Sequence, residues 1–398
     1  PLLEIPDAND TVIIRNGKTL TIPDTTDNVQ VALMVVNGEL DLTTSENHDF
    51  GVIEGSGTIR MQGNGTVDNF PVGTTTGPNG FANASNGGIL VLEGTGFEFE
   101  NDYTFNDVRL NLDNATDEVE LGSDLTINGN LTVRLGTLVF GDGTTVDREL
   151  TVYGDFIVEN NSGSQDGRVS TANANARHEF NLFGDFLNEG TVFFSQRDIN
   201  SIDIDNEATN GIVDVNFLND NADQTVDCNG ETNFYRIEID KGSNNTYRLI
   251  LQSSSTGNFV LTGAARYAIN DDISSINFTS VPDADDKNPN ALGLKRGTVV
   301  IGTNIDIAPL TTGAVKPVAG GPATSAIFST SKIEIDGGSI SNNDAAGAEG
   351  ALLLYGELNV IDGSYSGDHN GIVMRGIGLL KVGGGTVDIM QIRTYAIG

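Results

Sequence analysis

The sequence predicts an all-β protein that forms a right-handed parallel β-helix, or β-solenoid, with coils of about 20–30 residues. Three observations predict this fold class. Glycine supplies 49 of the 398 residues and asparagine is frequent, and both residue types favour tight turns. Short segments that alternate apolar and polar residues occur along the whole chain. Several of these segments recur with similar sequences at a spacing that matches one coil.

Strand segments are the commonest local pattern. Thr11-Val-Ile-Ile-Arg15, Ile89-Leu-Val-Leu-Glu93 and Arg236-Ile-Glu-Ile-Asp240 are three examples. Such alternation buries one face of a strand and leaves the other in solvent. Residues 173–180 come nearest to the pattern of an amphipathic helix, but they are too polar, so we expect no helix.

The clearest repeat lies in the middle of the chain. Leu125-Thr-Ile-Asn-Gly-Asn-Leu-Thr-Val133 returns as Leu150-Thr-Val-Tyr-Gly-Asp-Phe-Ile-Val158 and as Phe180-Asn-Leu-Phe-Gly-Asp-Phe-Leu-Asn188. The central glycines of the three copies lie 25 and 30 residues apart. Because one coil of this size cannot bury its apolar face alone, we expect the copies to stack, with backbone pairing between successive coils.

A shorter spacing is found near the C-terminus. Ile335-Asp-Gly337, Leu354-Tyr-Gly356 and Met374-Arg-Gly376 place glycines 19 and 20 residues apart, and Val36-Asn-Gly-Glu-Leu-Asp-Leu42 resembles Leu354-Tyr-Gly-Glu-Leu-Asn-Val360. These matches predict equivalent positions in different coils. The alternative architecture is a row of antiparallel β-sandwiches. It needs regular hairpin turns and aromatic anchors such as Trp, whereas this chain has no Trp and its Asn-Gly dipeptides are scattered.

The domain organisation that we expect is one continuous solenoid over residues 1–398. Loop excursions are expected near residues 64–87, 280–291 and 308–323, where turn-forming residues gather. Within the first of these loops, Asn64–Asn86 is the segment that we expect to contact a partner. The chain starts at Pro1 without the apolar core of a signal peptide and stops at Gly398 in a strand-like sequence. We therefore expect it to be a segment of a longer chain.

Charge and composition exclude several classes of function. The chain has 21 Lys and Arg against 55 Asp and Glu, which gives a net charge of −34. Such a chain is repelled by nucleic acids and anionic membranes. No run of about 18 apolar residues is present, so no direct membrane insertion through a helix is expected. A single Cys excludes an internal disulfide and a thiolate zinc cage.

One segment and the central repeat together resemble a known family. The segment Asp223-Gln-Thr-Val-Asp-Cys-Asn-Gly-Glu-Thr-Asn-Phe-Tyr-Arg-Ile-Glu-Ile-Asp-Lys241, read with the "Leu-Thr-Val-x-Gly-Asn-Phe" coils, is similar to large exported surface proteins of Bacteroidota. The opening Asp10-Thr-Val-Ile-Ile-Arg-Asn-Gly-Lys-Thr-Leu-Thr-Ile22 also resembles a first coil of those proteins. The resemblance implies export through the type IX secretion pathway and display on the surface of a Gram-negative bacterium, as an adhesin or gliding-motility filament. The sorting domain of that pathway is not visible here.

Catalytic motifs are missing from the sequence. His48, His178 and His369 lie far apart and are expected to be solvated turn residues, and Cys228 is expected to fill space in a coil. The enzyme alternative is a β-helical polysaccharide lyase or hydrolase, which would carry paired carboxylates on one face. The adjacent pairs Asp271-Asp272 and Asp285-Asp286 have turn-like contexts, and the short cluster Asp368-His369-Asn370-Gly371 reads as a polar β-turn.

Two kinds of non-catalytic site are predicted. Asp283, Asp285 and Asp286 lie in a loop whose alternating carboxylates suit calcium, and a solvated acidic loop is the alternative interpretation. The family resemblance implies O-glycosylation at Thr11 and Thr25, each of which follows an Asp. We therefore expect a non-catalytic segment of a surface adhesin or filament. Its expected partners are an extracellular surface or polysaccharide and the proteins of the export and outer-membrane machinery, with cargo or a structural component of that machinery as a further alternative.

Overall fold

The computed structural model describes most of the chain, in ten ranges. They are residues 6–24, 26–64, 70–161, 166–172, 176–195, 211–261, 292–307, 324–342, 351–367 and 371–395. These ranges contain strands, turns and bends but no helix. The chain divides into two compact units. Unit 1 comprises Pro1–Ala172 and Glu189–Thr191, and unit 2 comprises Asn173–Asn188 and Val192–Gly398.

Unit 1 is built from short strands. They are β1 (Thr11–Ile14), β2 (Thr19–Thr21), β3 (Leu33–Val36), β4 (Glu39–Asp41), β5 (Asp49–Glu54), β6 (Thr58–Gly63), β7 (Val72–Thr74), β8 (Ile89–Gly94), β9 (Gly96–Glu98), β10 (Tyr103–Phe105), β11 (Asp107–Asn111), β12 (Glu118–Leu121), β13 (Leu125–Ile127), β14 (Leu131–Phe140), β15 (Glu149–Val152), β16 (Phe156–Val158) and β17 (Gly167–Thr171).

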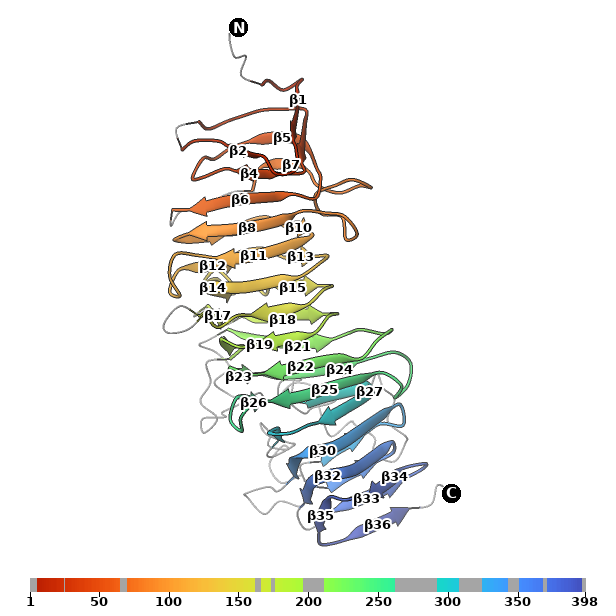
Figure 1. Ribbon diagram of the computed structural model, residues 1–398. Helices are drawn as coiled ribbons and strands as arrows, with labels where there is room; N and C mark the ends of the chain where they lie inside the picture. Colours follow the sequence, from red (N-terminus) through yellow and green to blue (C-terminus); the bar gives the residue numbers. More distant parts are fainter. Residues whose placement is uncertain are drawn as a thin grey trace. The chain divides into compact units, whose positions relative to one another are not determined.

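The strands of unit 1 pair in parallel with strands that come two or three places later in the chain. One sheet follows β2, β4, β6, β8, β11, β14 and β16, and Figure 1 shows β6, β8, β11 and β14 lying one after another. Two further series are β10, β13, β15 and β9, β12, β14, β17. The strands β1, β3, β5 and β7 form a separate parallel sheet.

Unit 2 follows the same plan. Its strands are β18 (Arg177–Leu182), β19 (Phe186–Asn188), β20 (Thr191–Phe193, which begins at the last residue of unit 1), β21 (Ile212–Phe217), β22 (Gln224–Cys228), β23 (Glu231–Phe234), β24 (Arg236–Asp240), β25 (Arg248–Ser253), β26 (Phe259–Leu261), β27 (Leu292–Ile301), β28 (Asp306–Ile307), β29 (Thr324–Ile327), β30 (Ser331–Asn342), β31 (Ala351–Leu354), β32 (Glu357–Gly367), β33 (Ile372–Arg375), β34 (Leu379–Val382), β35 (Thr386–Ile389) and β36 (Ile392–Tyr395).

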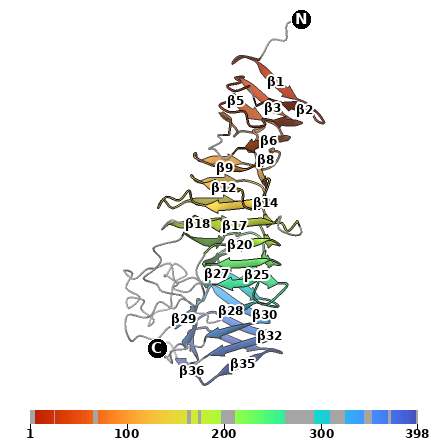
Figure 2. The ribbon, with the colours of Figure 1, turned by 90° about the vertical axis from the view of Figure 1, so that its left-hand side faces the viewer.

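Parallel pairing also organises unit 2. The strands β18, β21, β24 and β27 form one series, and β22, β25, β27, β30, β32 and β34 form another. The second half of β30 pairs with the second half of β32, which in turn pairs with β35, and Figure 2 shows these three strands in succession. A further sheet consists of β29, β31, β33 and β36. The fold is therefore all-β with predominantly parallel strands, as predicted, and it is compatible with a solenoid.

The central sequence repeat is confirmed as a structural repeat. Leu125 pairs with Leu150, and Leu131 pairs with Phe156, so the two copies in unit 1 lie side by side in the predicted register. The side chains of all four residues are buried. The apolar positions of the motif therefore form the core, because equivalent residues of successive coils stack on one another.

The C-terminal alignment is correct in one half and wrong in the other. Leu354 pairs with Met374, as the glycine spacing predicted. Ile335, however, pairs with Val360, and the residue that pairs with Leu354 in the preceding coil is Ile327. The Ile335-Asp-Gly337 motif belongs to a different sheet, because β30 is a long strand that continues through this glycine.

The match between the two ends of the chain is confirmed as local structure. In both copies a strand ends, two residues turn, and the next strand begins. The amides of Asn37 and Gly38 both donate to the carbonyl of Ile14, and those of Tyr355 and Gly356 both donate to the carbonyl of Ile327. A Cβ on Gly38 would lie 2.2 Å from a backbone oxygen, and one on Gly356 would lie 2.0 Å from another. Only glycine fits this corner.

Candidate functional site

The predicted site residues are only partly covered by the structure. Thr11 is the first residue of β1 and its side chain is exposed, so O-glycosylation there stays a prediction. Thr25, Asp283, Asp285 and Asp286 lie outside the described residues, as do Asp271-Asp272 and residues 368–370. The loops near residues 280–291 and 308–323 also lie outside the described residues. Of residues 64–87, positions 65–69 are not described, and the remainder includes β7.

The expectation that the histidines are solvated is wrong for two of them. His48 and His178 are 2% and 1% exposed. The amide of Val29 donates to Nδ1 of His48 over 3.2 Å, so Nε2 carries the proton and faces Oγ of Ser45 at 3.0 Å. Burial lowers the pKa of His48 and outweighs the backbone hydrogen bond with Ser45 and the charge of Asp27, which both act to raise it. This neutral imidazole is a structural hydrogen-bond bridge, because neither ring nitrogen is left to act as a base.

Cys228 is buried, as predicted. Its side chain is 0% exposed and burial raises its pKa to about 12. A thiol in such surroundings is neither nucleophilic nor metal-binding at neutral pH. Among the residues that the structure describes, no group of three or more His, Cys, Asp or Glu side chains is arranged to hold a metal ion.

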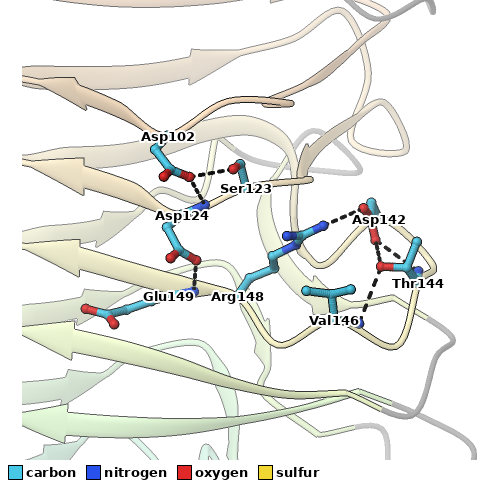
Figure 3. A network of polar contacts seen from close by, with 8 residues as sticks. All are labelled: Asp102, Ser123, Asp124, Asp142, Thr144, Val146, Arg148 and Glu149. Atoms are coloured by element: carbon cyan, nitrogen blue, oxygen red, sulfur yellow. Dashed lines mark hydrogen bonds and ion pairs between the residues drawn. The ribbon is translucent and has the colours of Figure 1, made fainter.

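A line of carboxylates in unit 1 bonds one coil to the next. Oδ1 of Asp102 accepts hydrogen bonds from Oγ of Ser123 at 2.6 Å and from the amide of Asp124 at 3.3 Å. Oδ1 of Asp124 accepts from the amide of Glu149 at 2.8 Å. Figure 3 shows this line running across the starts of three successive strands, β10, β13 and β15. Each acidic residue precedes a strand and satisfies the amide at the same register position one coil later.

The Gly-Asn/Asp pair of the central repeat makes the same bond. Oδ1 of Asp107 accepts from the amide of Asn130 at 2.7 Å, and Oδ1 of Asn130 accepts from the amide of Asp155 at 2.7 Å. A Cβ on Gly129 would lie 2.1 Å from Oδ1 of Asp107. A Cβ on Gly154 would lie 2.4 Å from Oδ1 of Asn130. The motif therefore needs an oxygen acceptor in one coil and a glycine in the next.

The carboxylate of Asp142 fixes the turn that lies beside Asp102 and Asp124 in Figure 3. Asp142 accepts from the amide and hydroxyl of Thr144 at 2.9 and 2.6 Å and pairs with Nη2 of Arg148 at 2.8 Å. Burial acts to raise the pKa of Asp142, but these hydrogen bonds and the guanidinium lower it to about 2. Asp142 is therefore ionised at any physiological pH and acts as a fixed acceptor.

Two glutamates near this turn have raised pKa values, in contrast to the lowered pKa of Asp142. Glu98 on β9 and Glu120 on β12 are register partners in adjacent strands. Burial raises the pKa of Glu98, and the charges of Glu100 and Asp142 add to this effect. Burial also raises the pKa of Glu120, with Glu118 and Glu98 adding to it. Neighbouring carboxylates with raised pKa values are one feature that glycan-cleaving enzymes use.

Unit 2 carries a charged outer face on β18, β21, β24 and β27. Its outward positions hold four cations and four carboxylates, which are Arg177, Arg236, Lys295, Arg296, Glu179, Asp214, Glu238 and Asp240. In a chain with 21 basic and 55 acidic residues, equal numbers make this face rich in cations. Arg177 binds Asp214 through two bonds of 2.9 and 3.1 Å, and Arg296 binds Asp240 through two bonds of 2.5 and 2.8 Å.

The centre of this face is a triad of Arg236, Glu238 and Lys295. Nη2 of Arg236 lies 2.7 Å from Oε2 of Glu238, and Nζ of Lys295 lies 2.5 Å from Oε1. The side chains of Arg236 and Glu238 are 1% and 7% exposed. Burial acts to raise the pKa of Glu238, but the charges of Arg236 and Lys295 outweigh it and the pKa is lowered. Glu238 therefore stays ionised between two cations.

Lys241 follows β24 and is also buried. Its Nζ donates to Oε1 of Gln224 over 2.6 Å. Burial lowers the pKa of Lys241 to about 8, although Asp223, Asp220 and Asp185 act to raise it. This lysine ties two neighbouring coils together, because Gln224 also donates to the carbonyls of Leu182 and Gly184.

Sequence reasoning did not find the charged face. The pattern Arg236-Ile-Glu-Ile-Asp240 was visible, but it predicts only a strand with a polar side. Recognising the face requires the register that places Arg236 beside Asp214 and Glu238 beside Gly293. Within the described part of the chain, no helix is long and apolar enough to cross a membrane. No protein-family model matches this sequence, and no curated protein and no solved structure matches it.

Proposed function

We propose that this chain is a right-handed parallel β-solenoid segment of a non-catalytic, exported cell-surface protein that acts in attachment or gliding motility. The observation that carries the proposal is the use of polar side chains as bonds between coils. Asp102, Asp107 and Asp124 in unit 1, and Asp185 and Asp223 in unit 2, each accept from the amide at the same register position one coil later. Groups bonded in this way stiffen a stack and are not free to act on a substrate.

Ion pairs between coils give the same support. Three contacts join different strands: Arg248 to Glu334 at 2.7 Å, and Lys332 and Lys381 to Glu357 at 3.3 and 2.9 Å. Lys332 also contacts Glu334 within β30 at 2.6 Å. The network therefore links β25, β30, β32 and β34, with β27 lying between β25 and β30. A stiff, acidic, soluble stack suits a protein that projects from a cell into water.

Electron microscopy of the purified chain tests the architecture. We expect elongated particles whose length corresponds to about 4.8 Å for each coil of the chain. Compact round particles would contradict the solenoid. Display is tested separately in the source organism, where limited trypsin treatment of intact cells should remove the protein from the surface. Protection of the protein in intact cells and digestion only after lysis would contradict export.

Attachment is the activity that this proposal predicts. Beads coated with the purified chain should bind to polysaccharide-coated surfaces more than beads coated with an unrelated protein of similar net charge. Equal binding of both kinds of bead would contradict the adhesin role. Calcium belongs to the same proposal. We expect the melting temperature to rise at millimolar calcium, whereas an unchanged melt would exclude a calcium site in this chain.

A polysaccharide lyase or hydrolase is the second candidate, and one observation favours it. Glu98 and Glu120 are register partners with raised pKa values, which a general acid requires. Incubation with a panel of neutral and acidic polysaccharides, followed by an assay of new reducing ends, decides between the two candidates. Cleavage that is lost in Glu98→Gln would establish the enzyme. Absence of cleavage across the panel supports the non-catalytic proposal.

A further inference from the structure

We propose that the triad of Arg236, Glu238 and Lys295 binds a carboxylate or sulfate group of an acidic polysaccharide. This inference deepens the proposed function, since it names a ligand class for an attachment protein, and it rests on that function only for its biological meaning. Its physical basis is that the guanidinium of Arg236 has hydrogen-bond donors without acceptors.

Arg236 is buried with part of its hydrogen-bonding capacity unused. Its residue is 1% exposed, and in the part of the chain that the structure describes, Nε and Nη1 have no hydrogen-bond partner. A buried guanidinium N–H without an acceptor is unfavourable, because the group has lost its hydrogen bonds to water and has formed none with the protein. An oxyanion beside Nε or Nη1 would supply the missing acceptors.

The charges of the triad favour an anion as the ligand. Within the triad, Glu238 is shared between Arg236 and Lys295, so two cations contact one carboxylate and the triad itself carries one positive charge. The whole face, with Glu179 beside Asp214, carries equal numbers of both charges, but two of the neighbouring carboxylates are already engaged. Asp214 is bound by both Nε and Nη2 of Arg177, and Asp240 is bound by Arg296. The remaining positive charge lies where solvent screening is weak, which strengthens its attraction for an anion.

The backbone shapes the space around Arg236. Glu238 pairs in register with Gly293 of β27. A Cβ on Gly293 would lie 2.7 Å from Nη2 of Arg236, so glycine lets the guanidinium lie close to this strand. The register of β24 and β27 then shifts between Ile239 and Asp240. This irregularity places Lys295 against Glu238 and Arg296 against Asp240, although the two cations are adjacent in sequence.

Solvent reaches the triad at Lys295. The side chain of Lys295 is 24% exposed, whereas that of Glu238 is 7% exposed. An acidic sugar approaching from solvent would meet the ammonium first and Arg236 behind it. This order of contacts suits one charged group at the edge of a larger molecule.

The test measures binding to three probes at constant ionic strength. They are a galacturonic acid trimer, sodium sulfate, and maltotriose as the neutral control. We expect the acidic trimer to raise the melting temperature of the wild-type chain and to give a binding signal in calorimetry, with no effect of maltotriose. Arg236→Met should weaken trimer binding about tenfold to a hundredfold, since one charge-assisted contact is lost. Lys295→Met should weaken it by a smaller factor.

Arg60→Met is the matched control. Arg60 is an ion-paired arginine on an outward position of β6 in unit 1, and its loss should leave trimer binding unchanged. The melt without probe shows whether Arg236→Met is folded. We expect it to melt below the wild-type chain but still cooperatively, because methionine breaks the buried pair with Glu238 and leaves Lys295 as the partner of that carboxylate.

Three outcomes would overturn the inference. They are no response of the wild-type chain to the trimer or sulfate, equal affinity of Arg236→Met and the wild-type chain, and equal weakening by Arg60→Met. Equal shifts with sulfate and trimer would support an anion site and identify the free oxyanion as a sufficient ligand. None of these results alters the rod or bead assays, so failure of this site and failure of the proposed function are distinguishable.

Discussion

The two units use charged side chains differently on strands that pair in the same way. In unit 1 the pair of Arg134 and Glu159 is solvated, with side chains 50% and 38% exposed at a separation of 3.6 Å. In unit 2 the pairs on the β18–β27 face are buried, and Asp214 is 1% exposed against Arg177. In both units the parallel register brings opposite charges together. Burial decides whether a given pair is a weak surface contact or a strong constraint.

Replacing a buried carboxylate should have the largest effect on the free energy of unfolding. Asp214→Asn leaves Arg177 with a neutral partner in a buried position. We expect a loss of about 3–5 kcal/mol in the free energy of unfolding. The matched change in unit 1 is Glu159→Gln, which should cost about 0–1 kcal/mol because this pair is exposed. Urea unfolding of both variants is the measurement, and equal losses would contradict the contrast between the units.

The glycine of the repeat motif should give the next largest effect. Gly129→Ala places a Cβ against Oδ1 of Asp107, and we expect a loss of about 1–3 kcal/mol from overpacking. Asp107→Ala removes the clash together with one hydrogen bond. The double variant should therefore lose less than the sum of the two single variants, as measured by a double-mutant cycle of thermal unfolding. Strict additivity would show that the side-chain contact is not the cause.

The carboxylates that precede strands should give a smaller and equal effect in both units. Asp124→Ala removes the acceptor for the amide of Glu149, and Asp223→Ala removes the acceptor for the amide of Arg248. We expect each to cost about 0.5–1.5 kcal/mol, because water replaces the lost acceptor in part. Hydrogen exchange at the two amides is the measurement. Asp124→Asn keeps an acceptor oxygen and should keep the protection of Glu149; faster exchange in this control would contradict the assignment.

The pH dependence attached to His48 should be the smallest effect, and it is confined to unit 1. The pKa of His48 is lowered in the fold from its ordinary value of 6.5. The unfolded chain therefore binds the proton more readily, so stability is fully present above pH 6.5 and falls as the pH drops toward the folded pKa. His48→Asn should melt with less sensitivity to acid between pH 7.5 and 5.5, compared as a difference from the wild-type chain. An equal fall in both chains would contradict this role.

Part of the fold and of the site was predictable from sequence. Alternation within segments such as residues 11–15 and 236–240 predicts strands, and the spacing of Gly129 and Gly154 predicts their stacking. The register Leu125 to Leu150 follows from similarity alone. The alignment of Ile335 with Leu354 failed because a glycine marks corners in some coils, whereas in β30 it lies within a long strand. The histidines were misjudged because polar neighbours in sequence do not show which face a side chain takes.

What the sequence determined by itself is the periodic part of this protein: the strands, the all-β class, the parallel stacking of the central repeat, and the Gly-Asn/Asp corner. These features depend on residues close together in sequence or on motifs that return unchanged. The grouping of charged side chains on the β18–β27 face depends on the tertiary structure. Arg177, Asp214, Arg236, Glu238 and Lys295 come from four strands and meet only because the register aligns them. Coil lengths vary along the chain, so a partner one coil away has no constant sequence distance, and burial then fixes how strongly each pair interacts.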